Sequence, residues 1–361
     1  MGKFTVLLNI LLAIVLIAGT VGCNGGEATQ TPAEGTPPGP TAEPITLKFV
    51  SSTTHEGVAA EAYNLFADLV EEYTDGRVTV DLFLGSQLFP VTEELEAVVT
   101  GAVDIMADAS YWIFQYVPDV MVFYVDGVWE GREHAYAALE ESELPRVLAE
   151  RIEEAGPVKV LGFMPASLVM GIINSVKEST HMKALEGFRI NSSPGSPPAP
   201  IYDYMGMVGV PLAYEEVPTS FMQGILDAVQ ITSDSMVSLR LYETGNHVLW
   251  RISSFPNLVM IMNEDSWESL PADARDIIIT EVMPEVYEFA KTKYREIEEV
   301  SVQTIAENVE TVNWVTQEDL HAYVEYARDH PVWKTQMLMV DPEIVEIIED
   351  CKRSSQQYQA D

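Results

Sequence analysis

A short motif, in which a helix-like run ends at a glycine and a strand-like run follows, occurs twice in this chain. Its first copy is Val99-Thr100-Gly101-Ala102-Val103-Asp104-Ile105, and its second is Met222-Gln223-Gly224-Ile225-Leu226-Asp227-Ala228. Glycine adopts the left-handed conformation just past a helix C-terminus without steric cost. The repetition predicts two α/β lobes of similar construction. Two lobes leave a cleft between them, and clefts at domain interfaces are where small ligands bind.

The N-terminus carries a targeting pattern. Lys3 precedes an apolar run over residues 6–17 that only Asn9 interrupts, and small residues then lead to Cys23. This pattern predicts a secretory signal over residues 1–22, because the run is too short for a spanning helix of about 20 apolar residues. Residues 20–23 resemble the lipobox of bacterial lipoproteins. That resemblance implies acylation of Cys23, a lipid anchor as the only membrane contact, and an extracytoplasmic (periplasmic or cell-surface) location. A plain signal peptide with an incidental cysteine is the alternative.

The composition of the chain limits how it can be stabilised and which classes of partner it can bind. Residues 23–44 are mostly Gly, Pro, Thr and Glu, which predicts a disordered tether. Cys351 is the only other cysteine, so a lipidated Cys23 leaves no disulfide and the core alone must stabilise the fold. The net charge of −36 argues against nucleic acid and anionic membrane surfaces, because both require basic patches.

The folded part begins with a predicted parallel βαβ unit. Residues 45–50 alternate as a strand does, a helix follows, and residues 78–84 form the next strand. We further expect an extended segment at 118–128, a helix at 132–155, a strand at 158–163, a strand at 188–191 and a loop at 192–198. The apolar face of the first helix comprises Ala59, Tyr63, Phe66, Val70 and Tyr73.

A long helical segment follows the second lobe. Residues 272–310 stay compatible with a helix, and Pro284 either kinks that helix or divides it in two. Crossovers near Leu168 and Phe255, with a return near Val300, make each lobe discontinuous. The expected organisation is lobe I at 45–168, lobe II at 169–255, a return to lobe I with the long helix at 256–298, and lobe II with C-terminal helices at 299–361.

No catalytic or cofactor motif occurs in the sequence. A P-loop, a Gly-x-Gly-x-x-Gly fingerprint, a Gly-x-Ser-x-Gly elbow and a His-Glu-x-x-His pair are all missing, and no histidine has metal-ligand spacing. The glutamate pairs are interpreted as solvated helix faces. We therefore expect a protein without catalysis, cofactor or metal. The pairs are Glu93-Glu94, Glu215-Glu216 and Glu298-Glu299.

Candidate ligand-binding residues lie at the predicted strand ends, because ligands of open α/β sheets bind beyond the carboxyl ends of the strands. Arg189 is the only basic residue among them and could grip a carboxylate. The alternatives are that Arg189 lies on the outer surface and that Trp112 lies in the core. The candidates are Thr53, Asp108, Tyr111 and Trp112 in the first lobe, and Asn174, Arg189, Asn191, Gln230 and Thr232 in the second.

Several segments, in their order and spacing, resemble the solute-binding proteins of TRAP (tripartite ATP-independent periplasmic) transporters. The resemblance implies an α/β, two-lobed periplasmic-binding-protein-like (type II) fold with a long helix spanning both lobes. It implies capture of a small organic solute in the interlobe cleft and delivery to TRAP permease membrane subunits. A sensory or scaffolding lipoprotein of the same fold is the alternative. The matching segments are 66–78, 101–105, Pro118 with the apolar residues after it, 185–190, 205–206, 210–211, 216–227 and 267–271.

The departures from this family fall at the ligand. The arginine that usually grips the solute carboxylate is replaced by Asn191, and a second arginine of some members is replaced by Met170. Gln230-Ile231 lacks the glutamate of the metal-linked branches, so a metal-bridged ligand is not expected. Burying a carboxylate without a cation is costly. Either Arg189 substitutes, or the pocket is altered away from simple carboxylates toward a neutral, cationic or weakly acidic solute.

Overall fold

The computed structural model describes residues 44–125, 127–129, 131–192, 200–212, 216–252 and 254–358, with the backbone alone for 352–358. All of them belong to the compact unit Glu43–Asp361. The predicted signal, the tether, Cys23 and most of the loop at 192–198 lie outside the described residues. In the described part of the chain, none of the helices combines the length and the apolar character that crossing a membrane requires.

The first sheet, sheet A, has five strands in the order β2-β1-β3-β10-β4. Strand β1 is parallel to β2 and β3, as the βαβ pattern predicts, and β10 runs antiparallel to β3 and β4. One face of the sheet packs against α1 and α10, and the other against α3, α4 and α13. The strands are β1 (Ile45–Ser51), β2 (Val78–Leu84), β3 (Ile105–Ala109), β4 (Val158–Pro165) and β10 (Asn257–Asn263).

The second sheet, sheet B, has six strands in the order β11-β9-β5-β8-β6-β7. Strand β5 is antiparallel to both of its neighbours, β8 and β9. One face packs against α6, α7 and α10, and the other against α5 and α11. The strands are β5 (Met170–Asn174), β6 (Arg189–Ser192), β7 (Val208–Pro211), β8 (Ala228–Thr232), β9 (His247–Arg251) and β11 (Thr311–Trp314).

The helices connect these strands. The shorter segments include one-turn helices that close loops. The α-helices outside the long helix are α1 (Val58–Tyr73), α2 (Val91–Val99), α3 (Arg132–Glu140), α4 (Leu144–Ala155), α5 (Pro200–Met205), α6 (Val217–Met222), α7 (Ser233–Ser238), α8 (Glu264–Ser269), α11 (Gln317–Asp329), α12 (Pro331–Met337) and α13 (Pro342–Tyr358). The 3-10 helices are η1 (Ser110–Ile113), η2 (Pro118–Phe123), η3 (Met182–Leu185) and η5 (Leu241–Glu243).

The repeated glycine motif has the predicted structure in both sheets. Helix α2 ends just before Gly101, whose φ is 72°, and α6 ends just before Gly224, whose φ is 69°. Each glycine is followed by a strand, β3 in sheet A and β8 in sheet B. An alanine at either position would be strained, since only glycine enters this region freely.

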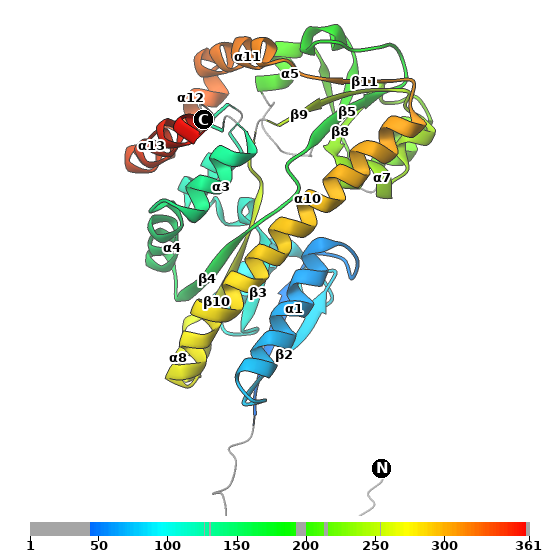
Figure 1. The fold of residues 1–361 in the computed structure, drawn as a ribbon. Coiled ribbons are helices and arrows are strands. Elements are labelled where there is room, and N and C mark those ends of the chain that lie inside the picture. Colours follow the sequence, from blue (N-terminus) through cyan, green and yellow to red (C-terminus); the bar gives the residue numbers. More distant parts are fainter. Residues whose placement is uncertain are drawn as a thin grey trace, which may run out of the picture. The chain divides into compact units, whose positions relative to one another are not determined.

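Two short connections join the sheets directly. Residues 166–169 lead from β4 to β5, and residues 252–256 lead from β9 to β10. The third link is the long helix, which starts beside α8 and sheet A and ends near α7 and sheet B (Figure 1). It comprises α9 (Ala272–Ile277), a π-helical turn (Ile278–Val282) and α10 (Met283–Asn308).

Pro284 does not divide the long helix. It stands in the first turn of α10, directly after the π-helical turn, and the helical run is continuous from Ala272 to Asn308. Proline lacks the N–H of a regular helical bond and crowds the preceding turn. A π turn is a usual way to absorb such a local mismatch within a helix. At 1.5 Å per residue, the run is about 55 Å long.

Three expectations from the sequence are wrong. Residues 118–123 form a 3-10 helix and not an extended segment, and Tyr124 closes it by donating its backbone N–H to the Met121 carbonyl at 2.9 Å. This segment is buried on nearly all sides, so its apolar run carried no strand periodicity. Residues 132–155 form two helices, because the Ser142 hydroxyl accepts from the Leu144 N–H at 3.1 Å and starts a new helix. Glu94 and Glu298 are buried, at 0 % and 2 % exposure, and not solvated.

The C-terminal helices contact both halves of the folded unit. Helix α11 inserts Tyr323 and Ala327 into the core of sheet B, beside α5. Helix α13 packs on α3 and α4 and contributes Ile344 and Ile348 to the core of sheet A. The segment 317–348 is therefore a further connection between the two sheets.

Candidate functional site

The two short crossovers determine which edges of the sheets face each other. Met170 begins β5 directly after the first crossover, and Arg251 ends β9 directly before the second. Met170 is paired in register with both Thr232 and Arg251, so these three residues share one edge of sheet B. On sheet A, the corresponding edge holds Pro165 and Asn257, which are paired with each other. We call these the hinge-facing edges.

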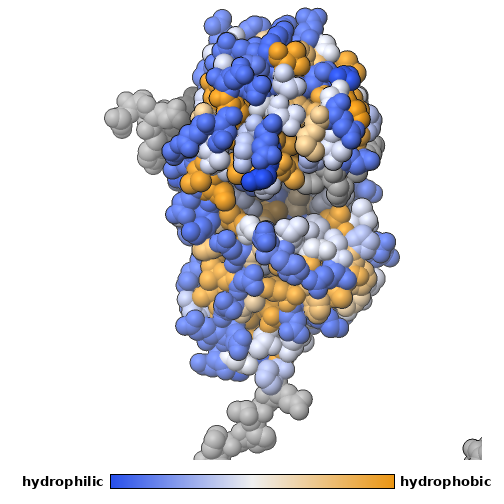
Figure 2. Space-filling model, turned by 90° about the vertical axis from the view of Figure 1, so that its right-hand side faces the viewer, coloured by the Kyte–Doolittle hydropathy of each residue, from blue (hydrophilic) through white to orange (hydrophobic). Residues whose placement is uncertain are grey.

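The surface is hollowed at the level where the two halves meet (Figure 2). Side chains of the hinge-facing edges therefore have the position that the cleft of a two-lobed binding protein requires. Clefts between domains are preferred sites for small ligands. The polar groups of these edges are the natural candidates for contacts to such a ligand.

A buried polar cluster stands at the hinge-facing edge of sheet A. The Asp108 carboxylate accepts from the Ser52 N–H at 3.0 Å and from the Ser52 hydroxyl at 2.5 Å, and Asp108 is only 4 % exposed. The Thr53 N–H donates to the Ser51 hydroxyl at 3.1 Å. The structure thus brings two of the predicted ligand contacts, Thr53 and Asp108, to one place, where Asp108 fixes the turn after β1.

Glu94 lies against this cluster. Its side chain is fully buried, and neither of its carboxyl oxygens accepts a hydrogen bond from any residue that the structure describes. Burial, together with the neighbouring Asp108 carboxylate, raises the pKa of Glu94 to about 9. At neutral pH, Glu94 is therefore a protonated acid that can donate to Asp108.

An aromatic and amide cluster continues the same edge. Tyr111 packs against Trp112 and Tyr124, with ring centroids 5.7 and 5.6 Å apart, and Trp112 is 38 % exposed and thus not a core residue. The Ser110 hydroxyl donates to the Asn257 side-chain oxygen at 2.5 Å. Asn257 is fully buried, and its side-chain N–H₂ group has no partner within the described part of the chain. The second pair of predicted contacts, Tyr111 and Trp112, thus adjoins a buried donor that needs an acceptor.

The hinge-facing edge of sheet B carries acceptors. Thr232 ends β8 and donates to the Ser235 hydroxyl at 2.9 Å. Three buried oxygens close to it have no partner among the described residues: Oε1 of Gln230, Oγ of Ser233 and Oδ1 of Asp234. Buried polar atoms in native proteins nearly always have a partner in protein, water or ligand. These atoms therefore suit a ligand or ordered water that donates hydrogen bonds.

The Asn191 side chain is hydrogen-bonded to β8 at both its oxygen and its nitrogen. Its side-chain oxygen accepts from the Gln230 N–H at 2.9 Å, and its N–H₂ donates to the Gln230 carbonyl at 3.3 Å. Asn191 thus extends the pairing of β6 with β8, which in register reaches only Ile190 and Ala228. The predicted contacts Asn191 and Gln230 do lie together, and they are hydrogen-bonded to each other.

Two other predicted contacts lie at the opposite edge of sheet B. Arg189 donates to the two carboxylate oxygens of Asp227 at 2.8 and 2.7 Å, and to the Gly224 carbonyl at 2.7 Å. This pair raises the pKa of Arg189 and lowers that of Asp227. Asn174 accepts from the N–H groups of Val176 and Lys177, both at 3.0 Å. Neither residue is close in register to the hinge-facing edge, so ligand contact by either stays a prediction without structural support.

Strand direction explains which residues the sequence reasoning missed. The prediction from sequence chose candidate ligand contacts at the carboxyl ends of the strands. Strands β5 and β10 run antiparallel to their neighbours, so their first residues lie at the hinge-facing edge. Met170 and Asn257 are these first residues. Arg251 also stands at this edge, only 4 % exposed and engaged in contacts within the protein. The polar residue directly after Pro256 was the one signal in the sequence for Asn257.

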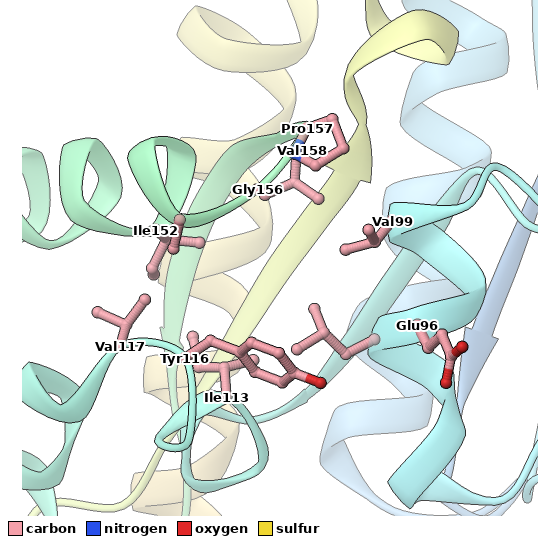
Figure 3. A pocket seen from close by; sticks show the side chains of 11 residues that line it. Glu96, Val99, Ile113, Tyr116, Val117, Ile152, Gly156, Pro157 and Val158 are labelled. Atoms are coloured by element: carbon pink, nitrogen blue, oxygen red, sulfur yellow. The ribbon is translucent and has the colours of Figure 1, made fainter.

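The largely apolar pocket in Figure 3 is a separate feature. It has a volume of about 160 Å³ and lies among α2, the turn after η1, α4 and the start of β4. Figure 3 shows Tyr116 reaching from the loop toward the helix that carries Glu96 and Val99. Val158 begins β4, whose other end leads into the crossover. The pocket therefore lies away from the hinge-facing edge and carries little polar recognition chemistry.

The metal-ligating side chains are scattered over the part of the chain that the structure describes. There, no three His, Cys, Asp or Glu side chains are grouped so that they could hold a metal ion.

Comparisons with known proteins identify the family of this chain. Residues 49–338 match the family described as bacterial extracellular solute-binding protein, family 7 (DctP). The C4-dicarboxylate-binding periplasmic protein DctP of Rhodobacter capsulatus is 26 % identical over 268 residues, which cover 73 % of this chain and 78 % of that protein. A solute-binding protein of Verminephrobacter eiseniae is 25 % identical over 222 residues, covering 62 % of this chain and 64 % of that protein.

Solved structures show the same fold. A TRAP periplasmic solute-binding protein of Ochrobactrum anthropi superposes with a TM-score of 0.79 at 17 % identity, over 87 % of this chain and 97 % of that one. A TRAP periplasmic solute-binding protein of Desulfovibrio salexigens, with bound orotic acid, has a TM-score of 0.72 at 17 % identity, over 85 % and 98 %.

The fold thus defines a two-lobed α/β periplasmic binding protein with a long helix. The chain belongs to the DctP family, the solute-binding proteins of TRAP transporters, and this family is not enzymatic.

Proposed function

We propose that this chain captures a small organic solute between the hinge-facing edges of its two sheets and delivers it to a TRAP-type membrane permease. The main support is a group of buried polar atoms at these edges that find no partner among the residues the structure describes: the Asn257 N–H₂ on sheet A, and oxygens of Gln230, Ser233 and Asp234 on sheet B. Such atoms are costly unless a ligand or water meets them. A solute that bridges both sheets would satisfy them together.

We further propose that the pocket is altered away from simple carboxylates. Oε1 of Gln230 and Oδ1 of Asp234 are acceptors, and the Ser233 hydroxyl can accept as well as donate, so these groups suit hydroxyl or ammonium donors on the solute. Met170 and Asn191 hold the positions where the resemblance to the family led us to expect arginine, and Arg189 is committed to Asp227. Solved relatives bind acids such as succinate in the protein of Sulfurospirillum deleyianum and β-D-galacturonate in that of Sulfitobacter. Of these two, the hydroxyl-rich acid matches the acceptors better.

The experiment is a thermal shift of the purified protein against succinate, galacturonate, mannitol and ethanolamine. A solute that binds only the folded state stabilises it by RT ln(1 + [L]/Kd), about 2.7 kcal/mol at a hundred times Kd. We expect an increase in melting temperature with a hydroxyl-bearing or ammonium-bearing compound and none with succinate. A shift with succinate alone would contradict the altered pocket. If no compound raises the melting temperature, even after the panel is extended with further members of these chemical classes, solute capture is contradicted.

Delivery is tested by reconstitution. We expect uptake of the identified solute into vesicles that hold the permease subunits only when this protein is added. Binding without any uptake would favour a sensory or scaffolding role. We also propose a lipid anchor at Cys23, which the Thr-Val-Gly-Cys sequence supports.

A further inference from the structure

One buried carboxylate joins three elements at the place where the sheets connect. Glu298 stands within α10 and is 2 % exposed. Its Oε1 accepts from the backbone N–H of Leu168, from that of Val169 at 3.1 Å, and from the Ser167 hydroxyl at 3.1 Å. Its Oε2 binds the guanidinium of Arg132, the first residue of α3.

The contacted crossover is the boundary between two cores. Leu168 packs in the core of sheet A that contains α3 and α4, whereas Val169 packs in the core of sheet B. The Val169 carbonyl in turn accepts from the N–H of Ser233, at the start of α7, at 2.9 Å. The lobe boundary therefore falls between two consecutive residues, and one oxygen of Glu298 holds both of their N–H groups.

The long helix changes lobes at the same level. Ala290 and Tyr294 pack in the core of sheet A, and Ile305 packs in the core of sheet B. Glu298 lies between these two contacts. Arg132 ties the second carboxylate oxygen to α3, whose residue Tyr136 is part of the other core of sheet A.

Burying a carboxylate without compensation is expensive, and a fully hydrogen-bonded ion pair offsets that cost. Burial raises the pKa of Glu298, while Arg132 and the backbone N–H groups oppose that rise. A hydrophobic side chain at this place would fill space equally well but would hold neither the crossover backbone nor Arg132. The Glu298 carboxylate thus fixes the positions of the crossover backbone and of Arg132 at the lobe boundary.

We propose that Glu298 is the pivot of the motion between the two sheets, fixing the crossover at 167–169 and α3 to the long helix while the lobes rotate about that point. Two-lobed binding proteins close around their ligands by hinge motion at a few residues. A fixed pivot confines this motion to one path. Glu298 is therefore a positioning residue for solute binding, because Met170 of the hinge-facing edge directly follows the segment that Glu298 holds.

The test compares Glu298→Gln with Glu299→Gln in the full chain. Glu299 is the exposed neighbour on the same helix, so its variant removes the same charge without touching the pivot. Spin labels at Asp81→Cys on β2 and Val176→Cys after β5, with Cys23 and Cys351 changed to Ser, report the distance between the lobes without any solute. Amide hydrogen exchange at Leu168 and Val169 reports the pivot itself.

We expect Glu298→Gln to widen the distance distribution at least twofold and to accelerate exchange at Leu168 and Val169 at least tenfold, with strand amides of both cores unchanged. Glu299→Gln should match the parent. If exchange rises equally in all strands, or if the distance distribution stays unchanged, the pivot is refuted and Glu298 is merely structural. Should Glu298→Gln not fold, Arg132→Gln removes only the contact to α3, and the same widening is expected from it. These readouts need no solute, so their outcome is independent of the proposed function.

Discussion

Arg189 and Asp227 form a two-pronged ion pair, with Arg189 Nε and a terminal nitrogen 2.8 and 2.7 Å from the carboxylate oxygens. This pair stands beside Gly224, at the edge of sheet B that faces away from the crossovers. The only basic residue among the candidates from sequence therefore serves the βαβ framework of its lobe. A solute at the hinge-facing edge must be recognised by other groups.

Asn191→Arg tests whether the loss of arginine at this position sets the solute preference. We expect the variant to bind succinate at least tenfold more tightly than the parent, because a charge-assisted contact to a carboxylate contributes about 1.5–3 kcal/mol. Calorimetric titration with succinate measures this change. Asn191→Gln is the control, since it lengthens the side chain without adding charge.

Both variants lose the two hydrogen bonds to Gln230, so they share a similar loss of stability. Unchanged solute preference in Asn191→Arg, with the fold retained, would count against the altered pocket.

Glu94→Gln should change how stability depends on pH. Because the folded pKa of Glu94 is raised to about 9, the folded state binds a proton that the unfolded state releases above its ordinary pKa. The contribution of Glu94 to stability is therefore complete below about pH 4 and decreases as the pH rises toward 9. The slope is at most about 1.4 kcal/mol per pH unit. Urea denaturation from pH 5 to 9 should show a flatter decline for the variant, and Glu93→Gln, which changes the exposed neighbour, should follow the parent. An equal slope in all three proteins would mean that Glu94 is ionised in the fold.

Gly171→Ala tests close packing beside the hinge-facing edge. An added Cβ would lie 2.3 Å from Cζ3 of Trp250 and 2.9 Å from Cε of Met236, so the strand or the indole must move. We expect a destabilisation of about 1–3 kcal/mol, as is usual for overpacking. Gly156→Ala is the control, because its Cβ would meet only Val99 at 3.8 Å. Equal melting temperatures for both variants would show that sheet B is looser than its contacts indicate.

Cys23→Ser should release the protein from the membrane. Without the acylated thiol, no membrane contact is expected, so the variant should appear in the soluble extracytoplasmic fraction. Cell fractionation of a bacterial host measures this. The parent and Cys351→Ser should both sediment with membranes, and a parent protein that is fully soluble would disprove the anchor.

Much of the fold was predictable because local rules govern it. The glycines at 101 and 224 both adopt the left-handed conformation that the repeat indicates, and the apolar face of α1 is buried at Tyr63, Phe66 and Val70. Where burial on all sides removed the periodicity, as at residues 118–123, the prediction failed. Glu94 and Glu298 were misread as solvated because a glutamate pair on a helix does not reveal which of its members points inward.

The candidate site was harder to predict, since it depends on strand direction. Thr232 ends β8 and Asp108 is the last residue but one of β3, and both strands run toward the hinge-facing edge. Asn174 ends a strand that runs away from it, and Asn257 begins one. Nothing local in the sequence encodes this direction, because β5 and β10 become antiparallel only through the two crossovers between the sheets.

The most direct measurement is a calorimetric titration of the solute found by thermal shift against two variants at opposite edges of sheet B. Thr232→Val removes a hydroxyl at the hinge-facing edge, and Arg189→Gln breaks the ion pair at the far edge. The account predicts at least a tenfold loss of affinity for Thr232→Val and less than a twofold change for Arg189→Gln. The reverse result, in which Arg189→Gln abolishes binding and Thr232→Val binds as the parent does, would contradict a solute site at the hinge-facing edges.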